Sequence, residues 1–278
     1  MLEKIRAPTI SSRAVAQGHG WTITDVVCRA GPEDRPYEEQ HGHMSIAAVL
    51  SGTFRYRAAS GTALLHPGAL LLGNAGTCFE CGHQHGRGDR CMAFHIDRAL
   101  FEEVAASAAG SSRLAFGTPM MPAMPELLPT LVEIEALSER ARRMAAESLV
   151  IRLVERVSEA LSGAPRRTVP ARGDERRISI ALRHIERHAD EALDLDSLAG
   201  LAAMSKYHFL RTFRRVTGLT PYKYLLGIRM RRAAVRLATS DAPVAAIAFD
   251  AGFGDLSTFN NRFRDLFGAT PTKFRAAA

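Results

Sequence analysis

Histidine and cysteine side chains gather in one part of the N-terminal third of the chain. His41 and His43 form a His-x-His pair, and Phe79, Cys81 and His83 follow one another at every second position. Residues two apart in a β-strand share a face, so each group can present its side chains to one site. Imidazole and thiolate suit zinc and other thiophilic metals. A metal site would use His41, His43, Cys81 and His83, whereas an effector pocket would also include Phe79.

The four cysteines of the chain are Cys28, Cys78, Cys81 and Cys91, and all lie in its first third. Four cysteines in 278 residues are too few for a disulfide framework, so reduced thiols or a metal site are expected. A redox- or electrophile-responsive thiol is a further alternative, as are plain pocket or structural residues. The sequence leaves these alternatives open.

Basic side chains gather in a different part of the chain. Residues 1–170 carry 18 Lys and Arg against 18 Asp and Glu, whereas residues 171–278 carry 18 against 11 and so hold the whole net charge of +7. No acid occurs from Ser197 to Ser240, a stretch with nine basic residues. A solvated helical face normally interleaves both signs, so this pattern favours a polyanionic partner such as nucleic acid.

The overall composition is that of a soluble globular protein with about two domains. Hydrophobic residues make up 46% and charged residues 23% of the chain, and the mean hydropathy is −0.07. No apolar run approaches the roughly 18 to 20 residues of a membrane-spanning helix, and residues 1–6 lack the apolar core of a signal peptide. We therefore expect a cytoplasmic protein without a membrane partner.

The periodicity of apolar residues changes along the chain. Short strand-like segments between Gly and Pro fill residues 20–97, which favours an antiparallel barrel or sandwich. From about Pro125 to Leu161 apolar residues recur every three or four positions, which indicates helices. Residues 162–173 mix Gly, Pro and Arg and are expected to form an exposed linker. The remainder is expected to be helical.

A repeat with an offset of 50 residues runs through this helical part. Phe209, Phe213, Gly218 and Pro221 recur as Phe259, Phe263, Gly268 and Pro271. A shorter apolar helix precedes each copy, over 195–203 and 244–251. Two short helices with a tight turn form a helix-turn-helix, whose second helix can lie in the major groove of DNA. The segment between the copies is expected to be a strut of roughly 27 Å.

Residues 194–218 and 246–271 resemble the C-terminal domain of the AraC/XylS family of bacterial transcription regulators. The resemblance covers about 100 residues in register. It implies sequence-specific binding to double-stranded DNA and control of transcription, usually activation through contact with RNA polymerase.

In the first reading helix, Ser205 is expected to be the N-cap, and Tyr207, Leu210 and Arg211 to project away from the core pair Phe209 and Phe213. Arg211 is the best candidate for a base contact because a guanidinium can bond guanine O6 and N7. The residues expected to hold phosphates are Lys206, Arg214 and Arg215; solvent exposure alone is the alternative.

The corresponding face of the second reading helix is less basic. Its candidate DNA contacts are Leu256, Ser257, Thr258, Asn260, Asn261 and Arg264. The family often has arginine where Asn261 stands, so this half is expected to prefer adenine or to read bases weakly. The residues expected in the core, from their helical spacing, are Phe249, Phe253, Phe259, Phe263 and Phe267.

The N-terminal part resembles the cupin-like sensor barrel of the same family over residues 20–97, through His41-Gly-His43 and Pro67-Gly68. In metal cupins a Glu follows the histidine pair and a later strand supplies another His. Here alanine stands at the Glu position and Phe79 at the later position. The enzyme-type metal site is therefore incomplete, and the resemblance implies a sensor for a small-molecule or metal effector.

We therefore expect a two-domain protein: an N-terminal all-β cupin-like barrel with following helices, and a C-terminal all-α domain with two helix-turn-helix units joined by a linker helix. The expected bounds are 1–122 for the sensor, 123–162 for a helical dimerisation segment, 163–173 for a linker and 174–278 for the DNA-binding domain. The expected contacts in a homodimer are Leu149, Leu153 and Val157.

Three alternatives stand beside an effector-responsive regulator. A cupin enzyme is disfavoured by the incomplete ligand set. An alkyl-acceptor protein with a zinc-bound cysteine on the same helical module would need a Pro-Cys-His-Arg motif, which the sequence lacks. A regulator controlled only by its abundance would need no effector.

Overall fold

The computed structural model describes residues 10–32, 34, 36, 38–83, 88–109, 115–140, 143–162 and 171–277. The chain divides into two compact units. The first comprises Met1–Met121 and Arg140–Ala171, and the second comprises Pro122–Glu139 and Arg172–Ala278.

The first unit is rich in strands. Its strands are β1 (Ile10–Gly18), β2 (Trp21–Cys28), β3 (Glu38–Gln40), β4 (Met44–Ser51), β5 (Phe54–Ala58), β6 (Gly61–Leu65), β7 (Leu70–Gly73), β8 (Cys78–Gly82), β9 (Asp89–Ile96) and β10 (Met120–Met121). Buried and half-buried residues alternate in β2, as in a strand with one face on a core. In β4 seven consecutive residues are buried, which requires cover on both faces.

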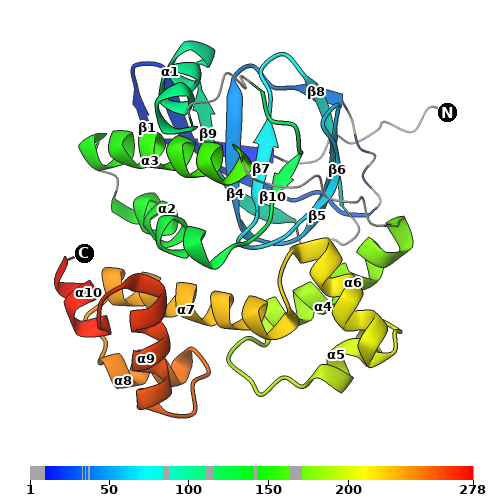
Figure 1. Ribbon diagram of the computed structural model, residues 1–278, viewed down its shortest axis with the longest axis vertical. Coiled ribbons are helices and arrows are strands. Elements are labelled where there is room, and N and C mark those ends of the chain that lie inside the picture. Colours follow the sequence, from blue (N-terminus) through cyan, green and yellow to red (C-terminus); the bar gives the residue numbers. More distant parts are fainter. Residues whose placement is uncertain are drawn as a thin grey trace. The chain divides into compact units, whose positions relative to one another are not determined.

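These strands form two antiparallel sheets (Figure 1). The order is β1-β2-β9-β4-β7-β10 in the larger sheet and β3-β8-β5-β6 in the smaller one. Side chains of both sheets share one core, in which Val49 and Ala93 meet Phe54 and Tyr56. Among the described residues no hydrogen-bonded strand pair joins the sheets. The expected barrel is therefore an open pair of facing sheets.

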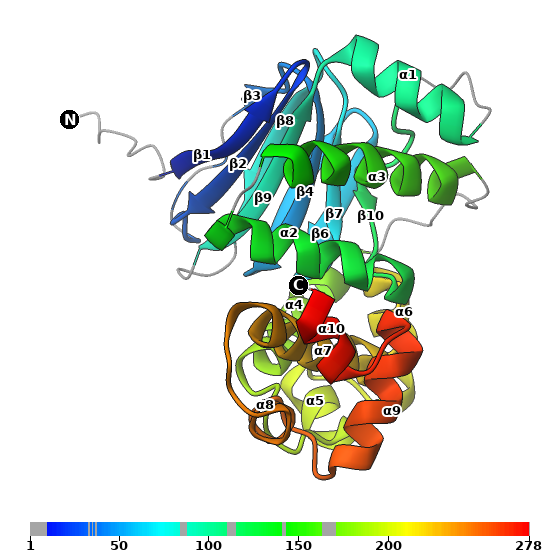
Figure 2. The same ribbon diagram turned by 90° about the vertical axis from the view of Figure 1, so that its left-hand side faces the viewer.

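Two helices complete this unit. Helix α1 (Arg98–Ala109) packs on α3 (Arg143–Ser162), which also contacts β1, and Figure 2 shows α3 lying across the larger sheet. Leu149, Leu153 and Val157 on α3 are 2%, 1% and 0% exposed. These side chains are buried in the chain itself, so they cannot form the expected dimer contacts.

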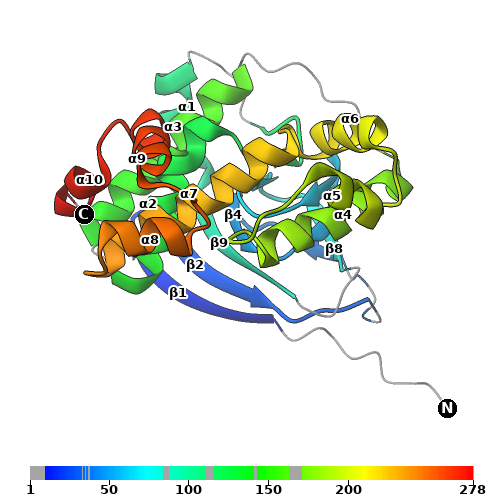
Figure 3. The same ribbon diagram turned by 90° about the horizontal axis from the view of Figure 1, so that it is seen from below.

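The second unit is helical. Its elements are the 3₁₀ turn η1 (Pro125–Leu127), α2 (Leu128–Arg140), α4 (Arg172–Arg187), α5 (Leu195–Leu201), α6 (Lys206–Thr217), α7 (Pro221–Thr239), α8 (Val244–Asp250), α9 (Leu256–Phe267) and α10 (Pro271–Ala277). Figure 3 shows α7 running between the group formed by α4, α5 and α6 and the group formed by α8, α9 and α10. Leu128 and Val132 of α2 lie in the same core as Phe259 and Phe263. The segment 123–162 is thus divided between the two units.

The internal repeat is visible in the backbone. Gly218 and Gly268 end α6 and α9 in the left-handed conformation, with φ of 84° and 70°, as glycine readily allows. Each is followed by a threonine whose hydroxyl accepts from a lysine amide three residues on, Lys223 after Thr220 and Lys273 after Thr270. The strand-rich first part and the helical second part confirm the predicted fold class. No helix in the described part of the chain is long and apolar enough to cross a membrane.

Candidate nucleic-acid interface and sensor interior

The first helix-turn-helix consists of α5 and α6. Asp194 caps α5 by accepting from the Ser197 amide at 2.8 Å. The chain reverses at Ala203, whose φ is +49°, and the Met204 amide donates to the Ala199 carbonyl at 3.0 Å. Phe209, on the inner face of α6, is completely buried. This core fixes which face of α6 is presented to solvent.

The solvent face of α6 carries the residues predicted to read DNA. Tyr207 is 85% exposed, Arg211 is exposed and Leu210 is half-buried. Ser205 stands at the N-cap, but its side chain makes no capping hydrogen bond. Its hydroxyl is exposed at the same end of the helix as Tyr207. A side chain here can reach a groove without disturbing the core.

The basic residues of α6 have different partners. Lys206 is paired with Asp196 at 2.8 Å, and Arg215 with Asp174. Arg214 is exposed in the last turn. Exposed ion pairs of this kind are weak and exchange readily for a phosphate. These positions are compatible with phosphate contacts.

Other members of the basic stretch hold the unit together. Arg229 donates to the backbone carbonyls of Ala189 at 2.5 Å and Glu191 at 2.7 Å, and Arg232 donates to the Glu186 carbonyl at 2.5 Å. These bonds join α7 to the end of α4. The count of basic residues therefore overstates how many of these side chains are available for contact with DNA.

Two more arginines of α7 pair with acids from outside the acid-free stretch. Arg231 is 5% exposed and lies 3.4 Å from Glu135 on α2, while Arg236 lies 2.7 Å from Asp250 on α8. Burial of a guanidinium is tolerable when a carboxylate faces it. The sequence could not indicate these pairs because their acids are 14 to 96 residues away.

The second helix-turn-helix consists of α8 and α9 and differs at its turn. The Phe253 amide donates to the Ala248 carbonyl at 3.1 Å, and Gly252 has φ of +88°. Phe253 and Gly252 lie 49 residues beyond Met204 and Ala203, their counterparts in the first turn. The buried phenylalanines of α6 and α9, in contrast, are 50 residues apart. The second turn is therefore one residue longer. Asp255 caps α9 by accepting from the Thr258 amide at 2.8 Å. Hydrogen bonds from the Thr258 side chain and then from its backbone amide lower the pKa of Asp255.

The exposed face of α9 is polar but nearly neutral. Its candidate contacts are Leu256, Ser257, Thr258, Asn261 and Arg264, all exposed, and the half-buried Asn260. Arg264 donates to the side-chain oxygen Oδ1 of Asn261 at 3.3 Å. Phe249 was expected in the core but is 54% exposed, because α8 buries Ile247 and Ala248 and turns Phe249 outward.

A buried polar pair lies among apolar side chains in the interior of the first unit. His41 Nε2 lies 2.7 Å from the Tyr56 hydroxyl, and the imidazole stacks on Phe79 with ring centroids 4.1 Å apart. Burial and nearby His95 lower the pKa of His41 to about 4. Cys81 packs against the same core, and burial raises the pKa of its thiol. His41, Tyr56, Phe79 and Cys81 thus form a mostly apolar interior, which we call the His41 interior.

His43 and His83 lie apart from that interior pair. His43 is exposed, and its Nε2 lies 3.6 Å from Asp97. His83 lies just beyond β8 with its side chain 5% exposed, and its Nε2 is 2.6 Å from Asp89. Burial favours the neutral ring, but hydrogen bonds with Asp89 and Cys28 outweigh it and raise the pKa of His83 to about 9. The four predicted metal ligands do not form one cluster.

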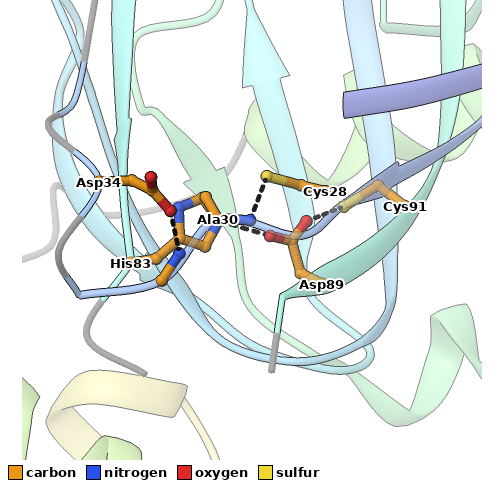
Figure 4. Close-up of polar contacts among 7 residues, drawn as sticks. Cys28, Ala30, Asp34, His83, Asp89 and Cys91 are labelled. Carbon is orange, nitrogen blue, oxygen red and sulfur yellow. Dashed lines mark hydrogen bonds and ion pairs between the residues drawn. The ribbon is translucent and has the colours of Figure 1, made fainter. Parts of the chain in front are cut away.

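A cluster different from the predicted one does form. Cys28, His83 and Asp89 place one ligand atom each within 4.8 Å of one another (Figure 4). Cys28 and Asp89 were missed because they are opposite each other in the pairing of β2 with β9, and that register is not readable from the sequence. A further histidine of this segment, His85, lies outside the described residues.

Comparison with known proteins decides the family. A model named "Helix-turn-helix domain" matches residues 198–277. The chain is 30% identical over 196 residues to the HTH-type transcriptional regulator YbfI of Bacillus subtilis, covering 70% of each protein. The chain belongs to the AraC/XylS family. It is also 37% identical over 91 residues to the regulatory protein SoxS of Escherichia coli, which covers 33% of this chain and 85% of SoxS.

A solved structure of the DNA-binding domain of AdpA, a global transcriptional factor in complex with a target DNA, is 33% identical. It covers 36% of this chain and 91% of the AdpA domain, with a TM-score of 0.35. The family model and the match to YbfI confirm the predicted recognition as an AraC/XylS regulator and its function in DNA-binding transcription regulation.

Proposed function

We propose that this AraC/XylS regulator reads an operator through α6 and α9, with base readout concentrated in α6. The observation that carries this is the pair of residues at equivalent positions, Arg211 on α6 and Asn261 on α9. Both are exposed and lie on helices whose inner faces are fixed by fully buried phenylalanines. Arginine recognises guanine, asparagine recognises adenine, and both contacts use the major groove.

The linker helix supports simultaneous engagement of two grooves. Helix α7 has 19 residues and is therefore about 28 Å long at 1.5 Å per residue. Successive major grooves on one DNA face are about 34 Å apart. The bonds from Arg229 and Arg232 to the end of α4 stiffen the middle of this strut. Bending of the DNA is expected to make up the difference.

The experiment is selection from random double-stranded DNA with the full chain, followed by binding titrations on the selected site. We expect a bipartite site whose halves are about one helical turn apart, with a conserved guanine opposite Arg211. The Arg211→Ala variant should lose preference at that guanine while its binding to random DNA changes little. Equal losses on the selected site and on random DNA would assign Arg211 to phosphate contact instead.

The sensor role of the first unit is a second part of the proposal. A small organic effector is supported by the His41 interior, where one hydrogen-bonded polar pair is surrounded by apolar side chains. Effector binding would act by shifting the population of DNA-competent states. Ligand-induced change in the melting of the full chain, lost in His41→Phe, tests this part. A regulator that acts without catalysis and without an effector is the outcome if no compound has such an effect.

We also propose a homodimer and contact with RNA polymerase, both implied by the family. The outer face of α3 is the available surface for the dimer, since its inner face is buried. It carries acids and bases together, Glu147, Arg152, Arg156 and Glu159, as a self-complementary two-fold contact requires. Sedimentation of the full chain against concentration tests the dimer, and charge reversal at Arg152 should weaken it.

A further inference from the structure

Three strand ends meet at one point of the first unit. Cys28 is the last residue of β2, Asp89 is the first residue of β9, and His83 follows the end of β8. Cys28 and Asp89 are direct partners in the β2–β9 pairing. His83 Nε2 lies 2.6 Å from Asp89 Oδ2. Figure 4 shows the thiol, imidazole and carboxylate converging, with Cys91 beside Asp89.

This cluster is buried and tightly framed. Cys28 is 8% exposed, and the side chains of His83 and Asp89 are 5% and 6% exposed. Gly88 has φ of +66°, and a Cβ there would lie 2.0 Å from the Cys28 carbonyl oxygen. A Cβ on Gly52 would in turn lie 2.4 Å from the Gly88 carbonyl oxygen. Two glycines thus let backbone segments approach closely enough to hold the three side chains in place.

We propose that Cys28, His83 and Asp89 bind a zinc ion that clamps the two sheets of the sensor unit together. Sulfur, imidazole nitrogen and carboxylate oxygen are the three donor types that zinc takes in proteins. One thiolate and one carboxylate balance the charge of the ion, so a buried site carries no net charge. The three donors lie within 4.8 Å of one another, which a tetrahedral site can close by small side-chain movements.

The required adjustment is modest. Two light-atom ligands at about 2.0 to 2.1 Å from zinc are roughly 3.3 Å apart in a tetrahedron. His83 Nε2 and Asp89 Oδ2, now 2.6 Å apart in a hydrogen bond, would separate by less than 1 Å. The fourth position is available to water or to Cys91, whose Sγ lies 3.7 Å from Asp89 Oδ1. The site thus has three protein ligands and one adjustable position.

The consequence of zinc binding follows from the topology. Strands β2 and β9 belong to the larger sheet and β8 to the smaller one, and no hydrogen-bonded strand pair joins these sheets in the described residues. The ion would link the two sheets by metal coordination, at the point where β2, β8 and β9 meet. This site shares His83 with the predicted set but includes none of His41, His43 and Cys81. Zinc binding can therefore be tested apart from the proposed organic effector and from DNA reading.

The test uses the full chain, purified without an affinity tag or chelator. We expect elemental analysis to find one zinc per chain, removable by a chelator and restored by titration with zinc alone. Removal should lower the melting temperature reported by fluorescence of Trp21, the single tryptophan, which lies on β2. A chain that retains no zinc and shows no saturable binding overturns the proposal.

Variants locate the site. Cys28→Ser and His83→Ala should each bind zinc at least about 100-fold more weakly, while the exposed His43→Ala should bind as the wild type does. Loss of zinc in His43→Ala with retention in Cys28→Ser would restore the sequence-derived ligand set and overturn ours. Should either ligand variant unfold, cobalt substitution in a Cys78→Ser, Cys81→Ser background decides, because the rival ligand set then has no thiolate. A thiolate-to-cobalt absorption band supports the site, and its absence overturns it.

Discussion

Helices α6 and α9 carry phenylalanines fifty residues apart, Phe209 with Phe259 and Phe213 with Phe263, and all four side chains are fully buried. The equivalent exposed positions differ, because α6 has Arg211 where α9 has Asn261. The two helix-turn-helix units therefore share their buried residues and differ in their exposed ones. Burial constrains volume and shape at the first kind of position, because a cavity or an overpacked side chain costs several kcal/mol. The fold does not constrain the exposed positions in this way, so the residues there can differ according to the DNA that each helix contacts.

The largest expected difference between the units lies at their turns. Gly252→Ala places a Cβ 2.8 Å from the backbone of Asp190 at a φ of +88°. We expect a loss of about 2 to 4 kcal/mol of unfolding free energy from the clash and the left-handed conformation together. Urea unfolding of the full chain followed by helical circular dichroism measures it, with Trp21 fluorescence reporting the first unit separately.

The matched control is Ala203→Gly at the equivalent position of the first helix-turn-helix. Ala203 already occupies φ of +49°. Glycine relieves that strain and loses more entropy on folding, so the net change is expected to stay within about 1 kcal/mol. A Gly252→Ala variant as mild as this control would mean that the second turn relaxes freely, against the close packing of Gly252 on Asp190.

Arg211→Ala should produce the largest change in DNA binding. We expect a loss of about 1 to 3 kcal/mol on the selected site and relaxed specificity at one base pair. Binding titrations on the selected site and on four variants of that base pair measure both effects. Arg214→Ala is the control, because loss of a phosphate contact weakens all sequences alike.

Asn261→Ala should have a smaller effect at the other half-site. Its side-chain amide is neutral, and the oxygen of that amide, Oδ1, already accepts from Arg264 at 3.3 Å. We expect a loss of about 1 kcal/mol or less, confined to an adenine position. Asn261→Arg should instead raise affinity and introduce a preference for guanine. Equal losses for Asn261→Ala and Arg211→Ala would show that the two halves read DNA equally. Base readout would then not be concentrated in α6.

The last turns of the two helices should behave alike. Arg214 and Arg264 occupy equivalent positions and are both exposed. Replacing either by Gln should reduce the slope of log affinity against log salt by about 0.9, because one phosphate contact is lost. Titrations at several salt concentrations measure the slope. A change for Arg214 but not for Arg264 would place only the first helix on the DNA backbone.

These contrasts also explain what the sequence could predict. Repeated residues such as Phe209 and Phe259 reveal the two units because the same packing requirement acts twice. Phe249 was misplaced because α8 has only seven residues, too few for its periodicity to define an inner face. The partners of Arg229 and Arg231 are carbonyls and acids brought close by tertiary folding. Cys28 and Asp89 become neighbours only through strand register, which an isolated strand pattern does not specify.

The smallest expected contrast concerns the residues that precede the two reading helices. Asp255 accepts from the Thr258 amide at 2.8 Å, whereas Ser205 makes no capping hydrogen bond through its side chain. Asp255→Ala should therefore lower the melting temperature, and Ser205→Ala should leave it unchanged but weaken DNA binding if the hydroxyl contacts phosphate. Hydrogen bonds from the side chain and the backbone amide of Thr258 lower the pKa of Asp255. Its stabilisation is thus fully present above the unfolded pKa and is lost as the pH falls through the folded value. The melting temperatures of wild type and Asp255→Ala should converge in acid, and a difference independent of pH would show that the carboxylate charge does not contribute.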